Sequence, residues 1–287
     1  MSQDPGNKEL TKKRAKKQVS FRTPPLIETA TSVQFNPLPK LGNAMLALLW
    51  NEQFRAEYPR PHDAEPIEPQ VERFGEGPPP RVQSMFRIGP FPGSRLMMAS
   101  DDDHWMVQAQ NGRIVFNWRK LGTSEYPRWE KTLPRFEQAY QKLKRFVEAQ
   151  KIGSIEPDQW EVTYANHLVQ GADWQTPQDW ASLVPGVLGC PRAVEGLRME
   201  SATGALHLEI EPRRGRLHVE LEHSVRRAGE KNEQILVLQL TARGNVEPGD
   251  DASLIAGLNL GRALIVNTFV QITGEAAHAR WGKYHAE

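Results

Sequence analysis

A long amphipathic stripe between Glu125 and Gln150 constrains the fold of this 287-residue chain more than any other feature. Its large apolar residues recur at alternating intervals of four and three: Trp129, Leu133, Phe136, Tyr140, Leu143 and Val147. This spacing places them on one face of a helix, with lysine and arginine side chains on the solvent-exposed faces. Ser124 is a suitable N-cap and Gly153 a suitable stop for this helix. A stripe this bulky must pack against a second apolar surface.

A predicted β-hairpin directly before this helix offers that surface. Asn111-Gly112 is a strong signal for a two-residue turn between antiparallel strands. The turn sets three apolar pairs opposite each other on one face: Trp105 with Trp118, Val107 with Phe116, and Ala109 with Ile114. A one-residue slip would exchange the two faces, so the apolar alternation fixes the register. We therefore expect the 125–150 helix to cover the apolar face of the hairpin.

The order strand, helix, hairpin, helix occurs twice in the chain. The first set has a strand over 26–35 and a short helix over 40–54 before the hairpin. The second set has a strand over 160–168, a short helix over 177–184, alternating strands around a turn at 212–215, a strand over 235–240, and a long helix that Asp250 or Asp251 can cap. The sequence thus predicts an α+β protein with two similar halves, residues 24–155 and 156–287. Each half is expected to be an antiparallel sheet with helices packed on one face.

The composition is typical of a folded protein in a reducing compartment. Apolar residues make up 39% of the chain, including eight tryptophans, which is enough to build a buried core. The single cysteine, Cys190, excludes an intramolecular disulfide framework. No run approaches about 18 uninterrupted apolar residues, the length of a membrane span. We therefore expect a cytoplasmic protein without a membrane partner.

The net charge of +1 conceals a basic N-terminal segment. Residues 1–22 carry seven lysines and arginines against two acidic residues, which leaves the remaining chain at −4. We expect residues 1–23 to form a disordered basic tail, because this composition has little to bury. The tail is either a solubilising extension or a contact for nucleic acid phosphates. The nucleic-acid alternative uses the tail and a second cationic turn, with these residues: Lys12, Lys13, Arg14, Lys16, Lys17, Arg213, Arg214 and Arg216.

Nine prolines fall between Pro59 and Gly93. Proline fixes φ and lacks an N–H, so this segment resists both helix and central strand. We expect it to wrap the surface in extended form. Alternatively, the run from Pro78 to Pro80 is a docking ligand for a partner domain.

The polar face of the second hairpin holds the best candidates for chemistry. The alternation places His207 near Glu220 and Glu209 near His218 on adjacent strands. Two imidazoles and two carboxylates are suitable ligands for a transition metal, and a metal here would make the chain a metal-dependent hydrolase. The alternative is that these four residues form charge pairs on a solvated face.

Five stretches of the sequence are similar to those of a known family. They are PPLIETATSVQF at 24–35, the hairpin ending FNWR at 116–119, YPRWEKTLPRF at 126–136, EVTYANHL at 161–168 and FVQITGEAAHARWG at 269–282. Together they resemble a family of uncharacterised bacterial proteins of about this length, with a sporadic distribution among genomes. The resemblance covers nearly the whole chain beyond the basic tail and implies no established activity or catalytic residue. A sporadic distribution is compatible with a mobile-element or phage-defence context.

The sequence favours a non-catalytic binding or assembly protein that engages another protein. It contains no Walker loop, dinucleotide glycine fingerprint, HExxH or GxSxG motif, and it predicts no cofactor and no catalytic residue. Exposed sheet edges, the proline-rich segment and the abundant aromatic residues suit a protein partner or a homo-oligomer. A nucleic-acid-associated factor and a metal-dependent hydrolase are the two alternatives.

Overall fold

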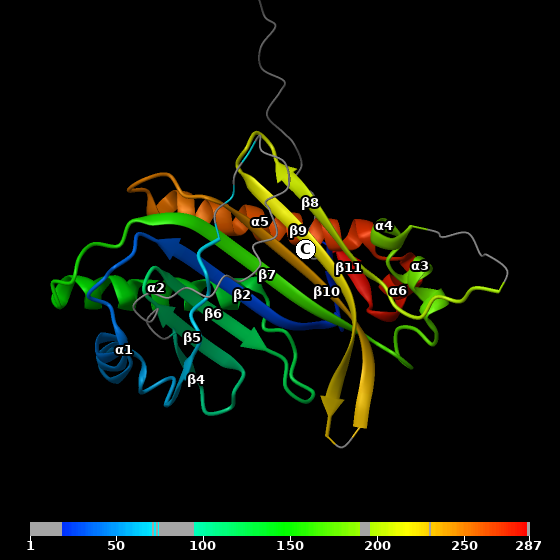
Figure 1. The fold of residues 1–287 in the computed structure, drawn as a ribbon, viewed down its shortest axis with the longest axis horizontal. Coiled ribbons are helices and arrows are strands. Elements are labelled where there is room, and N and C mark those ends of the chain that lie inside the picture. The colour runs from blue at the N-terminus through cyan, green and yellow to red at the C-terminus, as the bar shows by residue number, and fades with distance from the viewer. Residues whose placement is uncertain are drawn as a thin grey trace, which may run out of the picture.

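Nine strands form one antiparallel sheet in the computed structural model, which describes residues 19–70, 72, 74, 95–189, 196–229 and 231–285 (Figure 1). From edge to edge the strands are β3 (Arg60–Ala64), β4 (Arg95–Ala99), β5 (Trp105–Gln110), β6 (Arg113–Arg119), β2 (Leu26–Phe35), β7 (Pro157–Val169), β10 (Lys231–Asn245), β9 (Gly215–Ala228) and β8 (Thr203–Ile210). Helices pack on this sheet, and the predicted α+β class is confirmed.

The two predicted halves contribute adjoining parts of this single sheet. Residues 24–155 supply β3, β4, β5, β6 and β2, and residues 156–287 supply β7, β10, β9 and β8. The seam between the halves is the antiparallel pair of β2 and β7, which sets Val33 opposite Trp160 and Gln34 opposite Gln159. A fused sheet also removes two edges that separate sheets would expose.

The first hairpin and the helix after it fold largely as the sequence predicts. β5 and β6 pair in the predicted register, with Trp105 opposite Trp118. Helix α2 (Trp129–Ala149) buries the predicted stripe and continues through Pro134 in its second turn. Ser124 is not the N-cap, because its hydroxyl oxygen accepts the Leu121 N–H at 3.1 Å and the helix begins five residues later.

The two long helices, α2 and α5 (Asp251–Ile272), lie on the same face of the sheet, behind it in the view of Figure 1. Trp129 Nε1 on α2 donates to Asn259 Oδ1 on α5 at 2.8 Å. Lys144 on α2 forms an ion pair with Asp251 at 2.6 Å. These contacts join the helices, and together they cover the large apolar side chains of the central strands.

Helix α5 is long and apolar enough to cross a membrane by length and composition alone. In this structure its buried residues, among them Leu258 and Ile265, belong to the same core as the sheet. Asp250, one of the two predicted caps, accepts the Ala252 N–H at 2.8 Å. The expectation that the chain has no membrane partner stays a prediction.

The remaining elements lie at the ends of the sheet. A short helix and a π-helical turn, α1 (Asn43–Leu49) and η1 (Trp50–Phe54), occupy the predicted 40–54 helix. Short helical turns follow β7: η2 (Pro177–Asp179), α3 (Trp180–Leu183) and α4 (Pro185–Leu188). After α5 come α6 (Glu275–Arg280) and β11 (Lys283–His285). β11 pairs with β1 (Val19–Phe21), so part of the predicted 1–23 tail is a strand, whereas residues 1–18 lie outside the described residues.

Close packing between α5 and β7 depends on two glycines. A Cβ on Gly257 would lie 2.3 Å from the Trp160 ring, and a Cβ on Gly261 would lie 2.6 Å from it. Trp160 is only 2% exposed, so its ring has no room to move aside. The glycines cost helix propensity, but they let the helix backbone lie directly on the indole.

We expect Gly257→Val to lower the free energy of unfolding by about 1–3 kcal/mol, because the added side chain overlaps Trp160. Urea unfolding, followed by circular dichroism, would measure this loss. The matched control is Ala256→Val, one residue away on the exposed side of α5. Equal losses in the two variants would contradict the proposed close packing.

Candidate functional site

The face of the sheet opposite the helices carries polar side chains at alternate positions of its central strands. We call it the polar face and define it by Gln34, Gln108, Gln110, Arg113, Gln159, Glu161, Thr163, Arg216, His218, Thr241 and Arg243. The strand register aligns these residues in rows across the sheet. One row runs Gln110, Arg113, Gln34 and Gln159 over four neighbouring strands. The next contains Glu161, Arg243 and Arg216.

A segment from the proline-rich region crosses the polar face. We call residues 65–70 together with Glu72 the strap; it leaves β3 and lies in front of the sheet in Figure 1. The strap contains Pro66 and Pro69 and has no helix or strand assignment. The predicted surface wrapping is therefore observed for this part, while Pro78 to Pro80 lie outside the described residues.

Three glutamine side chains bind the main chain of the strap. The Gln110 amide donates to Ile67 O and accepts the Ile67 N–H, both at 2.8 Å. Gln34 accepts the Gln70 N–H at 3.1 Å and donates to Gln70 O at 3.3 Å. Gln159 donates to that same oxygen at 2.6 Å and accepts the Glu72 N–H at 3.4 Å. A primary amide offers one acceptor and two donor hydrogens, so each glutamine pairs with backbone as another peptide group would.

These amides bind peptide groups and do not depend on the strap side chains. Each proline of the strap stands immediately before a residue whose N–H is bound, Ile67 or Gln70, and proline itself has no N–H to leave unpaired. Proline also narrows the conformations of the free segment, which lowers the entropy lost on docking. The glutamines are in turn held by neighbours, since Arg113 donates to Gln34 Oε1 at 2.8 Å. The polar face is thus organised to hold an extended main chain.

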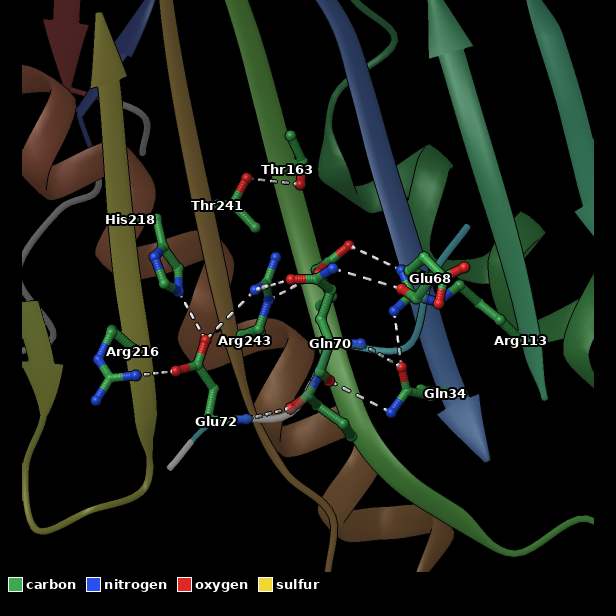
Figure 2. Close-up of polar contacts among 12 residues, drawn as sticks. Gln34, Glu68, Gln70, Glu72, Arg113, Thr163, Arg216, His218, Thr241 and Arg243 are labelled. Carbon is green, nitrogen blue, oxygen red and sulfur yellow. Dashed lines mark hydrogen bonds and ion pairs between the residues drawn. The ribbon is translucent and has the colours of Figure 1, made fainter. Parts of the chain in front are cut away.

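One strap side chain, Glu72, enters a receptor made by Arg216, His218 and Arg243 (Figure 2). Its Oε1 lies 2.7 Å from His218 Nε2 and 3.5 Å from Arg243 Nη1. Its Oε2 accepts from Arg216 Nη1. The Glu72 side chain is only 3% exposed, so all of these bonds are shielded from water. Charge-assisted hydrogen bonds of this kind are stronger than neutral ones.

The receptor groups have partners besides Glu72. Arg243 Nε donates to Glu161 at 2.8 Å, and His218 Nδ1 lies 2.8 Å from His207 Nδ1. The guanidinium of Arg216 lies 5.2 Å from the ring centroid of Phe74, a cation–π distance. The contacts with Glu161 and His207 come from the sheet, so they orient Arg243 and His218 independently of the carboxylate.

Burial raises the pKa of Glu72, but the hydrogen bond from His218 and the charges of His218, Arg243 and Arg216 outweigh it. The net effect is a pKa below the ordinary value of 4.5. The folded state therefore favours the ionised carboxylate, which suits a charged contact.

The predicted metal ligands are placed differently from the sequence expectation. His207 is opposite His218, Glu209 is opposite Arg216, and Glu220 is opposite Ala205, so the predicted His–Glu pairs are wrong. The connection between Ile210 and Gly215 sets this register, and a shift of two residues leaves every side chain on its predicted face. The pattern of alternating polar and apolar residues is the same in both registers, so it could not reveal the wrong pairing. Within the part of the chain that the structure describes, no three His, Cys, Asp or Glu side chains are grouped as a metal site.

The residues predicted to bind nucleic acid fall into different parts of the chain. Lys12, Lys13, Arg14, Lys16 and Lys17 lie outside the described residues, as does Cys190. Arg213 and Arg214 are exposed on the turn between β8 and β9. Arg216 instead belongs to the Glu72 receptor.

The polar face continues beyond the strap towards a cavity. The middle of this face has small side chains, Ala30, Thr163 and Ala165, which form a half-exposed floor. At its far end a cavity of about 450 Å³ is lined by residues that include Lys120, His167, Asp173 and Arg226. Burial and the charge of Arg226 lower the pKa of His167, whose Nδ1 lies 3.2 Å from the Arg226 guanidinium.

No protein-family model matches this chain, and no curated protein is detectably similar to it. The geometry of its own residues is therefore the basis for interpreting the site.

We expect Glu72→Gln to lower the free energy of unfolding by about 1–3 kcal/mol at neutral pH, because a neutral amide replaces a buried ion-pair partner. The lowered pKa of Glu72 means that this contribution is complete above pH 4.5 and is lost as pH falls through the folded-state value. The difference between wild type and variant should therefore shrink in acid. Chemical denaturation at a series of pH values would measure it.

Glu65→Gln is the control for this experiment, since it makes the same charge change at an exposed strap position. Its effect should stay within about 0.5 kcal/mol at every pH. A Glu72→Gln difference that grows in acid would contradict the assigned role of the carboxylate.

Proposed function

We propose that this chain is a non-catalytic protein-binding protein, and that the polar face is its recognition surface for an extended segment of a partner. The main support is the row of Gln34, Gln110 and Gln159, which makes six hydrogen bonds to peptide groups of the strap. A surface that pairs with peptide groups in this way suits another extended polypeptide equally well, as in other modes of main-chain recognition.

The pairing of charges on the polar face favours binding over hydrolysis. Glu161 is held by Arg243, with Arg113 3.6 Å away, and Glu72 is held by three donors. The lowered pKa of Glu72 leaves its carboxylate poorly suited to exchanging protons near neutral pH. The half-exposed floor beyond the strap offers further area to a partner.

The other expectations from the sequence stay predictions. A nucleic-acid role rests on the tail and on Arg213 and Arg214, and a metal-dependent hydrolase would rest on His207 and His218 alone. The prediction of a mobile-element or phage-defence context rests on the family resemblance.

The proposal can be tested with a synthetic peptide of residues 65–74 and a full-length variant whose strap is replaced by glycine and serine. Fluorescence anisotropy should detect binding of the labelled peptide to this strap-replaced variant. Adding Gln159→Ala should weaken binding by about fivefold or more, because at least one net hydrogen bond of about 1 kcal/mol is lost. N-methylation of the peptide at the Ile67 and Gln70 amides should weaken it further, since both donors are removed.

Arg213→Ala/Arg214→Ala in the strap-replaced variant is the control, because these arginines are exposed and take no part in the glutamine bonds to the strap. Circular dichroism would verify that every variant is folded. A folded strap-replaced variant that does not bind the peptide would overturn the proposed function.

A further inference from the structure

The Glu72 receptor combines groups from two adjacent strands on one face. Arg216 and His218 belong to β9, and Arg243 on β10 lies directly opposite Arg216. Strand alternation therefore directs all three side chains to the polar face at neighbouring positions. Their donors converge on both oxygens of a single carboxylate.

This receptor is built independently of the carboxylate it holds. Arg243 stays bound to Glu161, His218 stays beside His207, and both contacts come from the sheet. A carboxylate that left would expose Arg243 and His218 already oriented by the sheet, with Arg216 beside them. Such preorganisation favours affinity, because fewer side chains must be ordered when a ligand binds.

Glu72 reaches the receptor as part of a tethered segment. The glutamine bonds to the Gln70 N–H and carbonyl oxygen hold main-chain atoms, and these bonds can be exchanged for equivalent bonds to another chain. A tethered ligand has a high effective concentration, so it competes with any ligand that binds the same groups from solution.

We propose that the partner segment carries a glutamate side chain that takes the place of Glu72, and that the strap is a built-in competitor for it. This inference rests on the proposed function and specifies the partner as an acidic extended peptide. The receptor selects the carboxylate, and the glutamine row holds the main chain beside it. The apparent affinity for the partner is then set by the fraction of molecules whose strap is displaced.

The selection of a carboxylate is tested with the strap-replaced variant and two peptides. One is the 65–74 sequence, and the other has glutamine in place of its Glu72 equivalent. The glutamate peptide should bind at least tenfold more tightly, because only its side chain brings a negative charge to the cationic arginines and has two oxygens that accept. Arg216→Gln in the same variant should abolish most of that preference. A peptide with glutamine at the Glu65 equivalent is the matched control and should bind like the parent peptide.

The competitor role is tested with the full chain that keeps its strap. Glu72→Gln should bind the glutamate peptide several-fold more tightly than wild type does, and Glu65→Gln should bind it as wild type does. Hydrogen exchange at the Ile67 and Gln70 amides should become faster when the peptide binds, because the strap loses its glutamine partners.

The outcomes separate this inference from the proposed function. Equal binding of the glutamate and glutamine peptides to the strap-replaced variant would overturn the carboxylate specificity and leave main-chain recognition intact. Equal binding to wild type and Glu72→Gln would overturn the competitor role. Binding of neither peptide to a folded strap-replaced variant would overturn the proposed function itself, and this inference with it.

Discussion

The antiparallel pairing of β2 with β7 creates the surface on which the other features depend. It joins strands from opposite halves of the chain and sets Gln34 beside Gln159 and Ser32 beside Glu161. Without this seam the glutamine row would be split between two sheets, and no segment could contact both parts at once. The same pairing aligns Val33 with Trp160 on the other face, so the core and the polar face are continuous across the same junction.

The difference between the two faces of this sheet follows from the placement of both long helices on one side. Both long helices lie on one side, where Trp160 and the glycines of α5 allow close contact. Alternation along each strand then directs the intervening side chains to the opposite side, which no described helix covers. Most of those side chains are polar, and several of them, such as Arg113 and Gln159, are nonetheless buried, at 4% exposed each. The strap accounts for part of that burial, because it covers the row that these residues share.

Local patterns predicted local structure well. The Asn-Gly turn gave the correct pairing of β5 with β6, and the apolar spacing gave the buried stripe of α2. The second hairpin was correct in its faces but shifted by two residues, because its turn carries no comparable two-residue signal. No sequence motif marks Gln34, Gln110 and Gln159. Their proximity depends on the order of the strands in the sheet, which local periodicity does not encode. Glu72 was missed for the same reason: its partners are about 145 to 170 residues away in sequence.

The way the strap is held determines how freely its sequence can diverge. Because the glutamine amides bind main-chain N–H and C=O groups, which every residue except proline has in full, most strap positions can change over evolutionary time without loss of those bonds. The requirement for an N–H excludes only proline at positions 67, 70 and 72. The receptor, unlike the glutamine row, requires an acidic side chain, so selective pressure falls on Glu72, while the sheet beneath it must retain its amides and its cations together.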